Sequence, residues 1–417
     1  PRLVITGFNE GIVPQSVVGH AFLPDSIRGN LGLVDNARRF ARDVYQLHAL
    51  LAWRRPENVD VVLGRQNAQG DVLRPSRILF LTSEQELPRR ALHLFGEPPE
   101  QGAALPRTRA WKLRPPARRP PSRLPVTALR DYLSCPFRFY LRRILEMESL
   151  DDRKAEMDAL DFGNVCHWAW ERFAKNPDMR ESTDAVEIGR YLTAQVREIV
   201  AAQYGPDPPP AVALQLESAC QRLQAAGAVQ AQLRADGWRI LRAEHRLGNG
   251  KGVPLHGITV TGAVDRVDRH EDGRIRILDY KTSDKPRDPR AGHLAGLRTA
   301  PDCPEAYRVP DGRRQLRWVD LQLPLYCLLL GPEFEGPVEC GYFNLPRAAT
   351  ETGVAVWPIS PAEKNAARTC AETVIERIRA GIFWPPGPTP AYDDFESLFY
   401  DTPQESIDPE ELIGTRT

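Results

Sequence analysis

The chain has 417 residues, enough for two or three domains, and its 55 basic and 55 acidic side chains give a formal net charge of zero. That balance argues against a protein that coats nucleic acid over its whole surface. Its seven cysteines are scattered and form no Cys-x-x-Cys pair, which argues against a disulfide framework and against a zinc site. The sequence has no apolar run of about 18 residues and no signal peptide, so we expect a cytoplasmic protein without a membrane partner.

Residues 1–95 alternate apolar strands with an amphipathic helix. A strand is predicted at 1–8 and a helix at 38–53, which Asp35 or Asn36 could cap. This alternation indicates an α/β layer, and the segment resembles the C-terminal part of the second motor domain of UvrD/AddB-type helicases.

The chain starts without methionine, so we expect a piece of a longer protein. The sequence contains no Gly-x-x-x-x-Gly-Lys-Ser/Thr motif, the loop that cradles nucleotide phosphates. We therefore expect no ATP site in this chain.

Residues 96–122 are rich in proline and arginine and are expected to form an extended linker. Two interpretations of its charge stay open: the basic side chains follow the phosphates of a nucleic acid, or they belong to a solvated linker. The basic residues of this run, which no acid interrupts, are Arg107, Arg109, Lys112, Arg114, Arg118, Arg119 and Arg123.

Beyond the linker the pattern is mostly helical to about residue 235 and then turns to β-structure. Helices are predicted at 126–147, 160–175, 211–237, 315–330 and 361–381, and strands at 238–247 and 338–345. Residues 284–314 are rich in Pro, Gly and Arg, and they form either a mobile DNA-contacting loop or a disordered insert.

Between those strands lies a predicted β-hairpin. Residues 258–267 and 274–278 are rich in β-branched side chains, and Glu271-Asp272-Gly273 between them is a turn signal. If the chain reverses near Asp272, Asp265 falls opposite Asp279 on one face of the ladder.

Asp279 and Lys281 lie two residues apart on the second strand and therefore share a face, whereas Tyr280 points the other way. Two carboxylates are a sufficient anchor for a hard cation such as Mg²⁺, which polarises a phosphate and activates water. The alternative is a surface hairpin whose Asp–Lys ion pair has little energetic value.

Four sequence blocks occur in the order typical of one nuclease superfamily. They are VTALRDYLSCPFRFY at 126–140, GNVCH at 163–167, Asp265-Arg266-Val267-Asp268 with Asp279-Tyr280-Lys281-Thr282, and LQLPLY at 321–326. Together they resemble the PD-(D/E)XK nuclease superfamily, and within it the RecB/AddB-like branch.

The resemblance implies an α/β fold in which a mixed, restriction-endonuclease-like sheet is flanked by helices. It places the nuclease domain at 123–400 and a C-terminal tail at 401–417, after the smaller helicase-like segment.

The resemblance also implies a role for each matching residue. The metal ligands would be His167, Asp265, Asp279 and the backbone carbonyl of Tyr280. Lys281 would be the catalytic lysine, while Gln322 and Tyr326 would lie near the site and contact DNA or brace the lysine.

Four further charged residues flank these positions. Glu244 is a weaker site candidate on the preceding strand, and Glu171 could join the site or form a salt bridge. Arg266 and Asp268 are expected to be charges on the strand surface.

The sequence departs from the branch in its cysteines. Many AddB-like nucleases hold an iron–sulfur cluster with the Cys of Cys-Pro-Phe and three cysteines near the C-terminus. Cys135 is present here, but no cysteine follows Cys370. Since such clusters need four thiolates, we expect no iron–sulfur cluster. Aromatic packing is expected to close the domain instead, through Phe383, Trp384, Phe395 and Phe399.

The function that the resemblance implies is a Mg²⁺- or Mn²⁺-dependent deoxyribonuclease that hydrolyses a phosphodiester with metal-activated water. Its partners would be single-stranded DNA ends and a helicase subunit of an AddAB-like complex, in double-strand-break repair and recombination. Two alternatives stay open: a non-catalytic DNA-binding scaffold of such a complex, and a phosphodiesterase of RNA or small nucleotides.

Overall fold

The structure is a computed structural model of the whole chain, divided into two compact units, Pro1–Thr108 and Arg109–Thr417. The residues that it describes are 2–16, 22–67, 69–96, 112–116, 118–148, 156–297, 303–311, 314–387, 394–395, 398–399 and 402–414. Most of the predicted linker at 96–122, with Arg107 and Arg109, lies outside these ranges, so the expected domain boundaries stay predictions.

The first unit is built on two short parallel strands, β1 (Leu3–Thr6) and β2 (Val59–Val62). Between them runs α2 (Asn36–Arg54), whose N-cap is Asp35: its side chain accepts a hydrogen bond from the Arg38 N–H. The predicted helix and its cap are thus confirmed. The unit also contains α1 (Asp25–Asn30) and α3 (Leu87–Phe95).

The second unit is organised around a mixed five-stranded sheet, which confirms the predicted fold class. Its strand order is β13-β12-β8-β7-β4, and β8 and β12 are parallel while the other neighbours are antiparallel. The strands are β4 (Trp238–Arg246), β7 (Ala263–His270), β8 (Ile275–Lys281), β12 (Val338–Asn344) and β13 (Gly353–Trp357).

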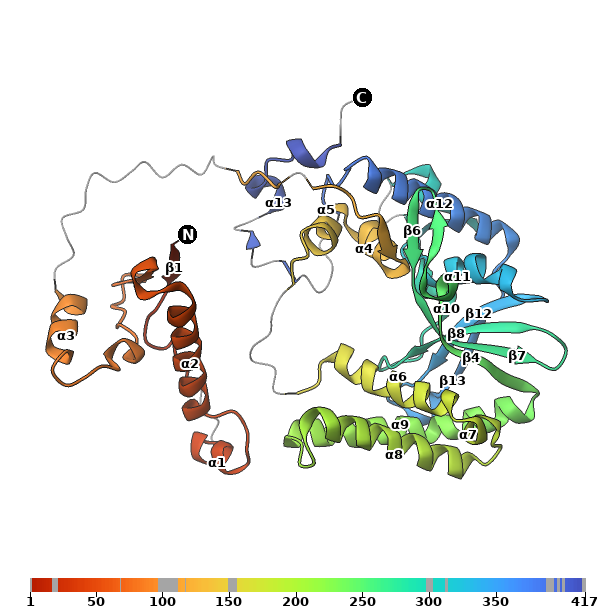
Figure 1. Cartoon of the computed structure of the whole chain (residues 1–417), viewed down its shortest axis with the longest axis horizontal. Coiled ribbons are helices and arrows are strands. Elements are labelled where there is room, and N and C mark those ends of the chain that lie inside the picture. Colours follow the sequence, from red (N-terminus) through yellow and green to blue (C-terminus); the bar gives the residue numbers. More distant parts are fainter. Residues whose placement is uncertain are drawn as a thin grey trace. The chain divides into compact units, whose positions relative to one another are not determined.

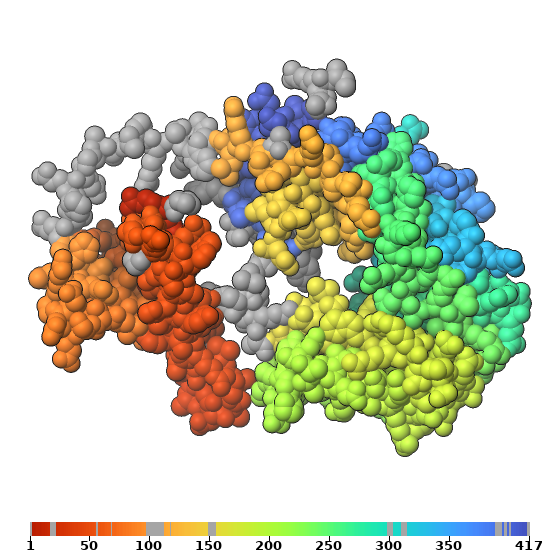
Figure 2. Space-filling view, in the orientation of Figure 1, coloured from red at the N-terminus to blue at the C-terminus, as the bar shows by residue number. Residues whose placement is uncertain are grey.

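Helices cover both faces of this sheet (Figure 1). One layer holds α6 (Ala159–Lys175), α7 (Pro177–Glu181), α8 (Ala185–Tyr204) and α9 (Pro210–Ala235), which Figure 2 shows as a continuous surface coloured yellow to yellow-green. The other holds α4 (Val126–Ser134), α5 (Pro136–Phe139), α11 (Gln322–Leu330) and α12 (Pro361–Arg379). None of the described helices is long and apolar enough to span a membrane.

The first strand of the predicted hairpin is broken at Gly262, so the single strand expected at 258–267 is wrong. β6 (Ile258–Thr261) belongs to a separate three-stranded sheet with β3 (Arg123–Pro125) and β5 (Val253–Leu255). A Cβ on Gly262 would lie 3.0 Å from the Tyr326 hydroxyl, so the chain passes α11 closely where it changes sheets.

Two predictions in the segment after β8 need correction. Residues 314–318 form a strand, β11 (Arg314–Trp318), so the helix expected at 315–330 starts at Gln322 instead. Residues 284–314 are not simply a loop, because they contain α10 (Pro289–His293), β9 (Leu294–Gly296) and β10 (Arg308–Asp311), with β9, β10 and β11 forming a small antiparallel sheet.

The hairpin reversal is confirmed. β7 and β8 pair antiparallel with Arg266 opposite Leu278 and Arg269 opposite Ile275, and the same register continued by one residue sets Asp265 against Asp279. Gly273 adopts φ 93° at the turn, a conformation that side-chain-bearing residues rarely adopt.

Arg266 and Asp268 are buried, so their assignment as surface charges is wrong. Both side chains point toward the layer of α6 and α9. They are buried because helices cover this face of the sheet as well as the other. The Arg266 Nε donates to Asp268 Oδ1 over 2.6 Å, Nη1 donates to Gln230 Oε1 over 2.6 Å, and the guanidinium lies 6.0 Å from the Trp170 ring. The pair is therefore an ionic contact inside an aromatic core.

Aromatic rings from the C-terminal segment close the domain against α5, as expected. Phe137 contacts Trp384 and Phe399, with ring centroids 5.5 and 5.7 Å apart, and Phe139 stacks on Phe383 at 6.0 Å. The Phe395 side chain is also buried. Cys135 is buried among these rings, and its sulfur accepts the N–H of Gly387 over 3.1 Å.

Replacing Asp268 should destabilise the fold strongly. The Asp268→Ala change leaves the Arg266 charge buried without its partner, which costs about 3–5 kcal/mol in comparable cases. Urea unfolding followed by tryptophan fluorescence measures the loss. The control is Asp272→Ala, which removes an exposed aspartate at the hairpin turn, and it should shift the transition far less. Equal shifts for both variants would contradict a structural role for the buried pair.

Candidate functional site

Three neighbouring strands and one helix bring the candidate residues together. β8 carries Asp279 and Lys281, β7 carries Asp265, and β4 carries Glu244. His167 comes from α6, on the helical layer, and reaches the end of the sheet at the same place.

The backbone of Tyr280 joins the helix to the two strands. Its N–H donates to Asp265 Oδ2 over 2.8 Å, and its carbonyl lies 3.3 Å from His167 Nε2. His167 Nδ1 lies 3.5 Å from the same Asp265 oxygen. The side chains of His167 and Asp265 and the carbonyl of Tyr280, three of the predicted metal ligands, are therefore adjacent.

Glu244, a weaker candidate from sequence alone, lies opposite Asp265 in the ladder between β4 and β7. It adopts φ 47°, a left-handed conformation that is unusual for a glutamate inside a strand. Such conformations persist where the surrounding structure imposes them, often at functional sites. One ligand atom each of His167, Glu244 and Asp265 lies within 4.8 Å of the others.

Asp279, the fourth predicted ligand, is held by other side chains. The Gln322 side-chain amide donates to its Oδ1 over 2.8 Å, and Lys281 Nζ lies 2.6 Å from its Oδ2. The Tyr326 hydroxyl donates to the Ala263 carbonyl over 2.8 Å, at the start of β7. Gln322 thus contacts Asp279, and Tyr326 contacts the start of β7. Neither hydrogen bond is to Lys281, although bracing that lysine was one of the roles that the resemblance implied.

Two carboxyl groups of the site, those of Asp265 and Glu244, have raised pKa values. Burial raises the pKa of Asp265 well above its usual range, and the nearby charges of Asp279 and Glu244 act in the same direction. Burial also raises the pKa of Glu244, with a contribution from Glu171, which itself pairs with Lys175. Each of these groups would be stabilised by a positive charge among them.

The donor set suits a divalent cation. Carboxylate oxygens with a backbone carbonyl are the ligands of hard cations, and an imidazole is acceptable to Mn²⁺. Burial lowers the pKa of His167, which keeps its ring neutral and able to donate a lone pair. The residues that could hold the ion are therefore His167, Glu244, Asp265 and Asp279, with the Tyr280 carbonyl.

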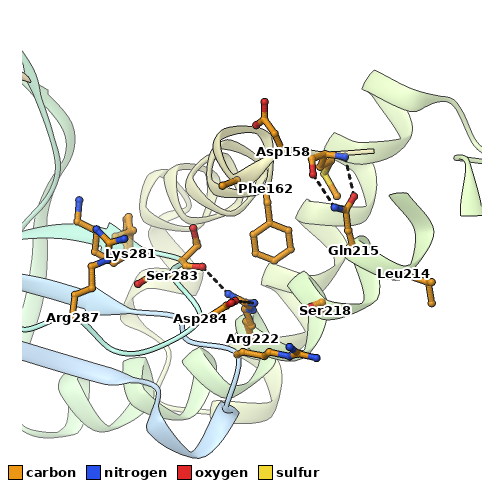
Figure 3. Close-up of a pocket in the computed structure, with 15 residues that line it drawn as sticks. Asp158, Phe162, Leu214, Gln215, Ser218, Arg222, Lys281, Ser283, Asp284 and Arg287 are labelled. Atoms are coloured by element: carbon orange, nitrogen blue, oxygen red, sulfur yellow. Dashed lines mark hydrogen bonds and ion pairs between the residues drawn. The ribbon is translucent and has the colours of Figure 1, made fainter. Parts of the chain in front are cut away.

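Two cavities meet at Lys281. The larger, of about 570 Å³, lies between α6, α9 and the segment after β8, and its lining includes Phe162 and Arg222 (Figure 3). The smaller, of about 330 Å³, lies toward α4 and α10, and Lys281 and Arg287 line both. No motif pointed to Phe162 or Arg222, because they are distant in sequence and meet through the packing of two helices.

Comparison with known proteins bears on the second unit. A family model described as the PD-(D/E)XK nuclease superfamily matches residues 123–391. No curated protein matches the chain in sequence. Among solved structures, one named "Putative exonuclease" from Eubacterium rectale is 11% identical, with a TM-score of 0.36, over 65% of this chain and 86% of its own.

Removing the Asp265 charge should stabilise the metal-free protein at neutral pH. Because the pKa of Asp265 is higher in the folded chain than its usual value near 4, stability falls as pH rises from about 4 through the folded-state pKa. Asp265→Asn keeps an acceptor for the Tyr280 N–H and should raise the melting temperature in EDTA by about 2 °C. This gain should vanish below about pH 4.

The hairpin offers a control of opposite sign. The pKa of Asp272 is lowered to about 2, chiefly by the backbone N–H of Arg274, so its charge stabilises the fold at neutral pH. Asp272→Asn should therefore lower the melting temperature at pH 7, and the difference should shrink as the pH falls. A melting temperature of Asp265→Asn below that of the wild type would show that the carboxylate is not under repulsion.

Proposed function

The chain belongs to the PD-(D/E)XK nuclease superfamily, and on that basis we propose that it is a metal-dependent deoxyribonuclease. The observation that carries the proposal is the meeting of His167, Asp265 and the Tyr280 carbonyl beside Asp279 and Lys281. Carboxyl groups with raised pKa values near a lysine, here Asp265 and Glu244 near Lys281, are an electrostatic arrangement that suits metal-assisted phosphodiester hydrolysis.

In this proposal His167, Asp265, Asp279 and the Tyr280 carbonyl hold the ion, with Glu244 as a further ligand. A bound Mg²⁺ or Mn²⁺ would polarise the scissile phosphate and supply hydroxide at neutral pH. The backbone N–H of Tyr280 fixes the orientation of the Asp265 carboxylate, and Gln322 fixes that of Asp279.

Lys281 is the cationic side chain best placed to act on the phosphate. Its Nζ lies 2.6 Å from Asp279 Oδ2 and 4.8 Å from the centre of the Tyr342 ring, so two contacts restrict its position. An ammonium fixed there would donate a hydrogen bond to the phosphate oxygen on which negative charge develops. Its pairing with Asp279 keeps it directed at the site.

We further assign the chain to the RecB/AddB-like branch, as part of a helicase–nuclease that processes DNA ends in double-strand-break repair. Support comes from the order of the four sequence blocks and from the α/β segment at 1–95. DNA and a helicase subunit are the partners that follow from this assignment.

The site is tested by removing both hairpin carboxylates. Wild-type protein should cleave end-labelled single-stranded DNA with Mg²⁺ or Mn²⁺ but not with EDTA, and Asp265→Ala/Asp279→Ala should lose about a thousandfold or more of the rate. Asp272→Ala, on the same hairpin, should retain it. Undiminished cleavage by the double variant would move the active site elsewhere, and DNA binding without any cleavage would favour a scaffold.

Lys281→Ala should separate catalysis from metal binding. Since the ammonium is not a ligand in this proposal, titration calorimetry with Mn²⁺ should still detect binding, while cleavage falls by about a hundredfold or more. A variant that loses Mn²⁺ binding together with cleavage would show that the lysine acts by organising the ligands.

A further inference from the structure

The larger of the two cavities at Lys281, called here the α6/α9 cavity, extends away from the proposed metal ligands, and apart from Tyr280 and Lys281 its lining residues have no role in the chemistry proposed above. Its walls come from α6 (Phe162), from α9 (Leu214 and Arg222) and from the segment that leaves β8 (Lys281 to Arg287). Figure 3 shows the Phe162 ring and the Arg222 side chain directed toward one another between the two helices. At about 570 Å³ it falls within the roughly 300–1,000 Å³ of small-ligand sites.

Arg222 is a buried arginine that forms the floor of this cavity, with 7% of its surface exposed. Its Nη1 donates to the carbonyls of Thr282 and Leu345, over 2.7 and 3.2 Å, and its guanidinium lies 4.8 Å from the centre of the Phe162 ring. The Nε of Arg222 is buried and makes no hydrogen bond within the described part of the chain. The floor of the cavity is therefore a positively charged side chain that is held by two backbone carbonyls and that has one donor, the Nε–H, without an acceptor among the residues described.

The charge of the cavity is unbalanced. Its cationic residues are Arg222, Lys281, Arg287 and Arg347, and its acidic residues are Asp158 and Asp284. Asp284 lies 3.6 Å from Arg222 Nη2, but its side chain is 80% exposed, so solvent screens it. Burial lowers the pKa of Arg222, and the nearby charge of Arg347 acts in the same direction. An anion would relieve this excess of positive charge.

The cavity also has apolar surface along its helices. Phe162 offers an aromatic ring and Leu214 an aliphatic side chain with 76% of its surface exposed. The Gln215 amide between them is fixed by two hydrogen bonds to the backbone of Met157, over 2.9 and 2.8 Å. A wall of this kind suits a flat, partly apolar group such as a nucleobase.

We propose that the α6/α9 cavity binds one unpaired nucleotide of the substrate strand, next to the phosphate at Lys281. The phosphate of that nucleotide lies toward Arg287 and Arg347, and its base lies against Phe162 and Leu214. A base must leave its partner and its stack before it can lie against these side chains, so the cavity selects single-stranded over duplex ends. This inference rests on the proposed nuclease function for the position of the scissile bond.

Binding of a fluorescein-labelled oligothymidylate in EDTA, followed by anisotropy, tests the cavity without cleavage. Arg347 is exposed at the rim and lies outside the proposed catalytic set, so Arg347→Gln should fold normally. The variant should raise the Kd for the single strand by about tenfold, the value of one charge-assisted phosphate contact. A hairpin duplex with the same number of phosphates should be affected much less.

Two further variants complete the test. Arg190→Gln makes the same charge change at an exposed position of α8 that does not line the cavity, and it should leave the Kd unchanged. Leu214→Asp places a charge on the base wall and should also weaken single-strand binding.

Three outcomes would overturn the proposal. They are an unchanged Kd for Arg347→Gln, equal losses for Arg347→Gln and Arg190→Gln, and equal losses on single strand and duplex. Because binding is measured without metal, absence of cleavage would count against the nuclease function alone.

Discussion

The convergence of three carboxylates at one end of the central sheet is the constraint on which the arrangement of this domain depends. Asp265, Asp279 and Glu244 lie on three adjacent strands, and burial and nearby negative charge raise the pKa of Asp265 and of Glu244. The surrounding groups offset that cost: the Tyr280 N–H, the Gln322 amide and the Lys281 ammonium all donate to or pair with these side chains. Since Tyr280 and Lys281 belong to β8 and Gln322 to α11, the sheet and α11 must keep their places for the carboxylates to stay together.

The local part of this arrangement could be predicted from the sequence. A hairpin's register follows from its turn, so the turn near Asp272 was enough to place Asp265 against Asp279. Lys281 followed from the two-residue period of a strand. His167 was predicted through resemblance alone, because nothing in a helix rich in aromatic residues distinguishes a ligand from a core histidine.

The parts that escaped prediction depend on contacts between distant segments. Arg266 and Asp268 were expected at the surface because charged residues usually lie there, but helices cover both faces of the sheet. Gly262, where the strand breaks, lies against Tyr326, and the strand at 314–318 pairs with β9 and β10. Arg222 contacts the ends of β8 and β12 because α9 packs beside the sheet. The hydrophobic periodicity of a single sequence does not predict which residues of two distant segments will meet.

The aromatic closure between α5 and the C-terminal segment gives the domain a particular response to temperature. Phe137, Phe139, Phe383 and Trp384 hold the two ends by contact between rings, with Cys135 enclosed among them. Association of apolar surfaces is driven mainly by entropy near 25 °C and weakens on cooling. The ends of the domain are thus held less tightly in the cold, while the ionic contacts of the hairpin do not share this dependence.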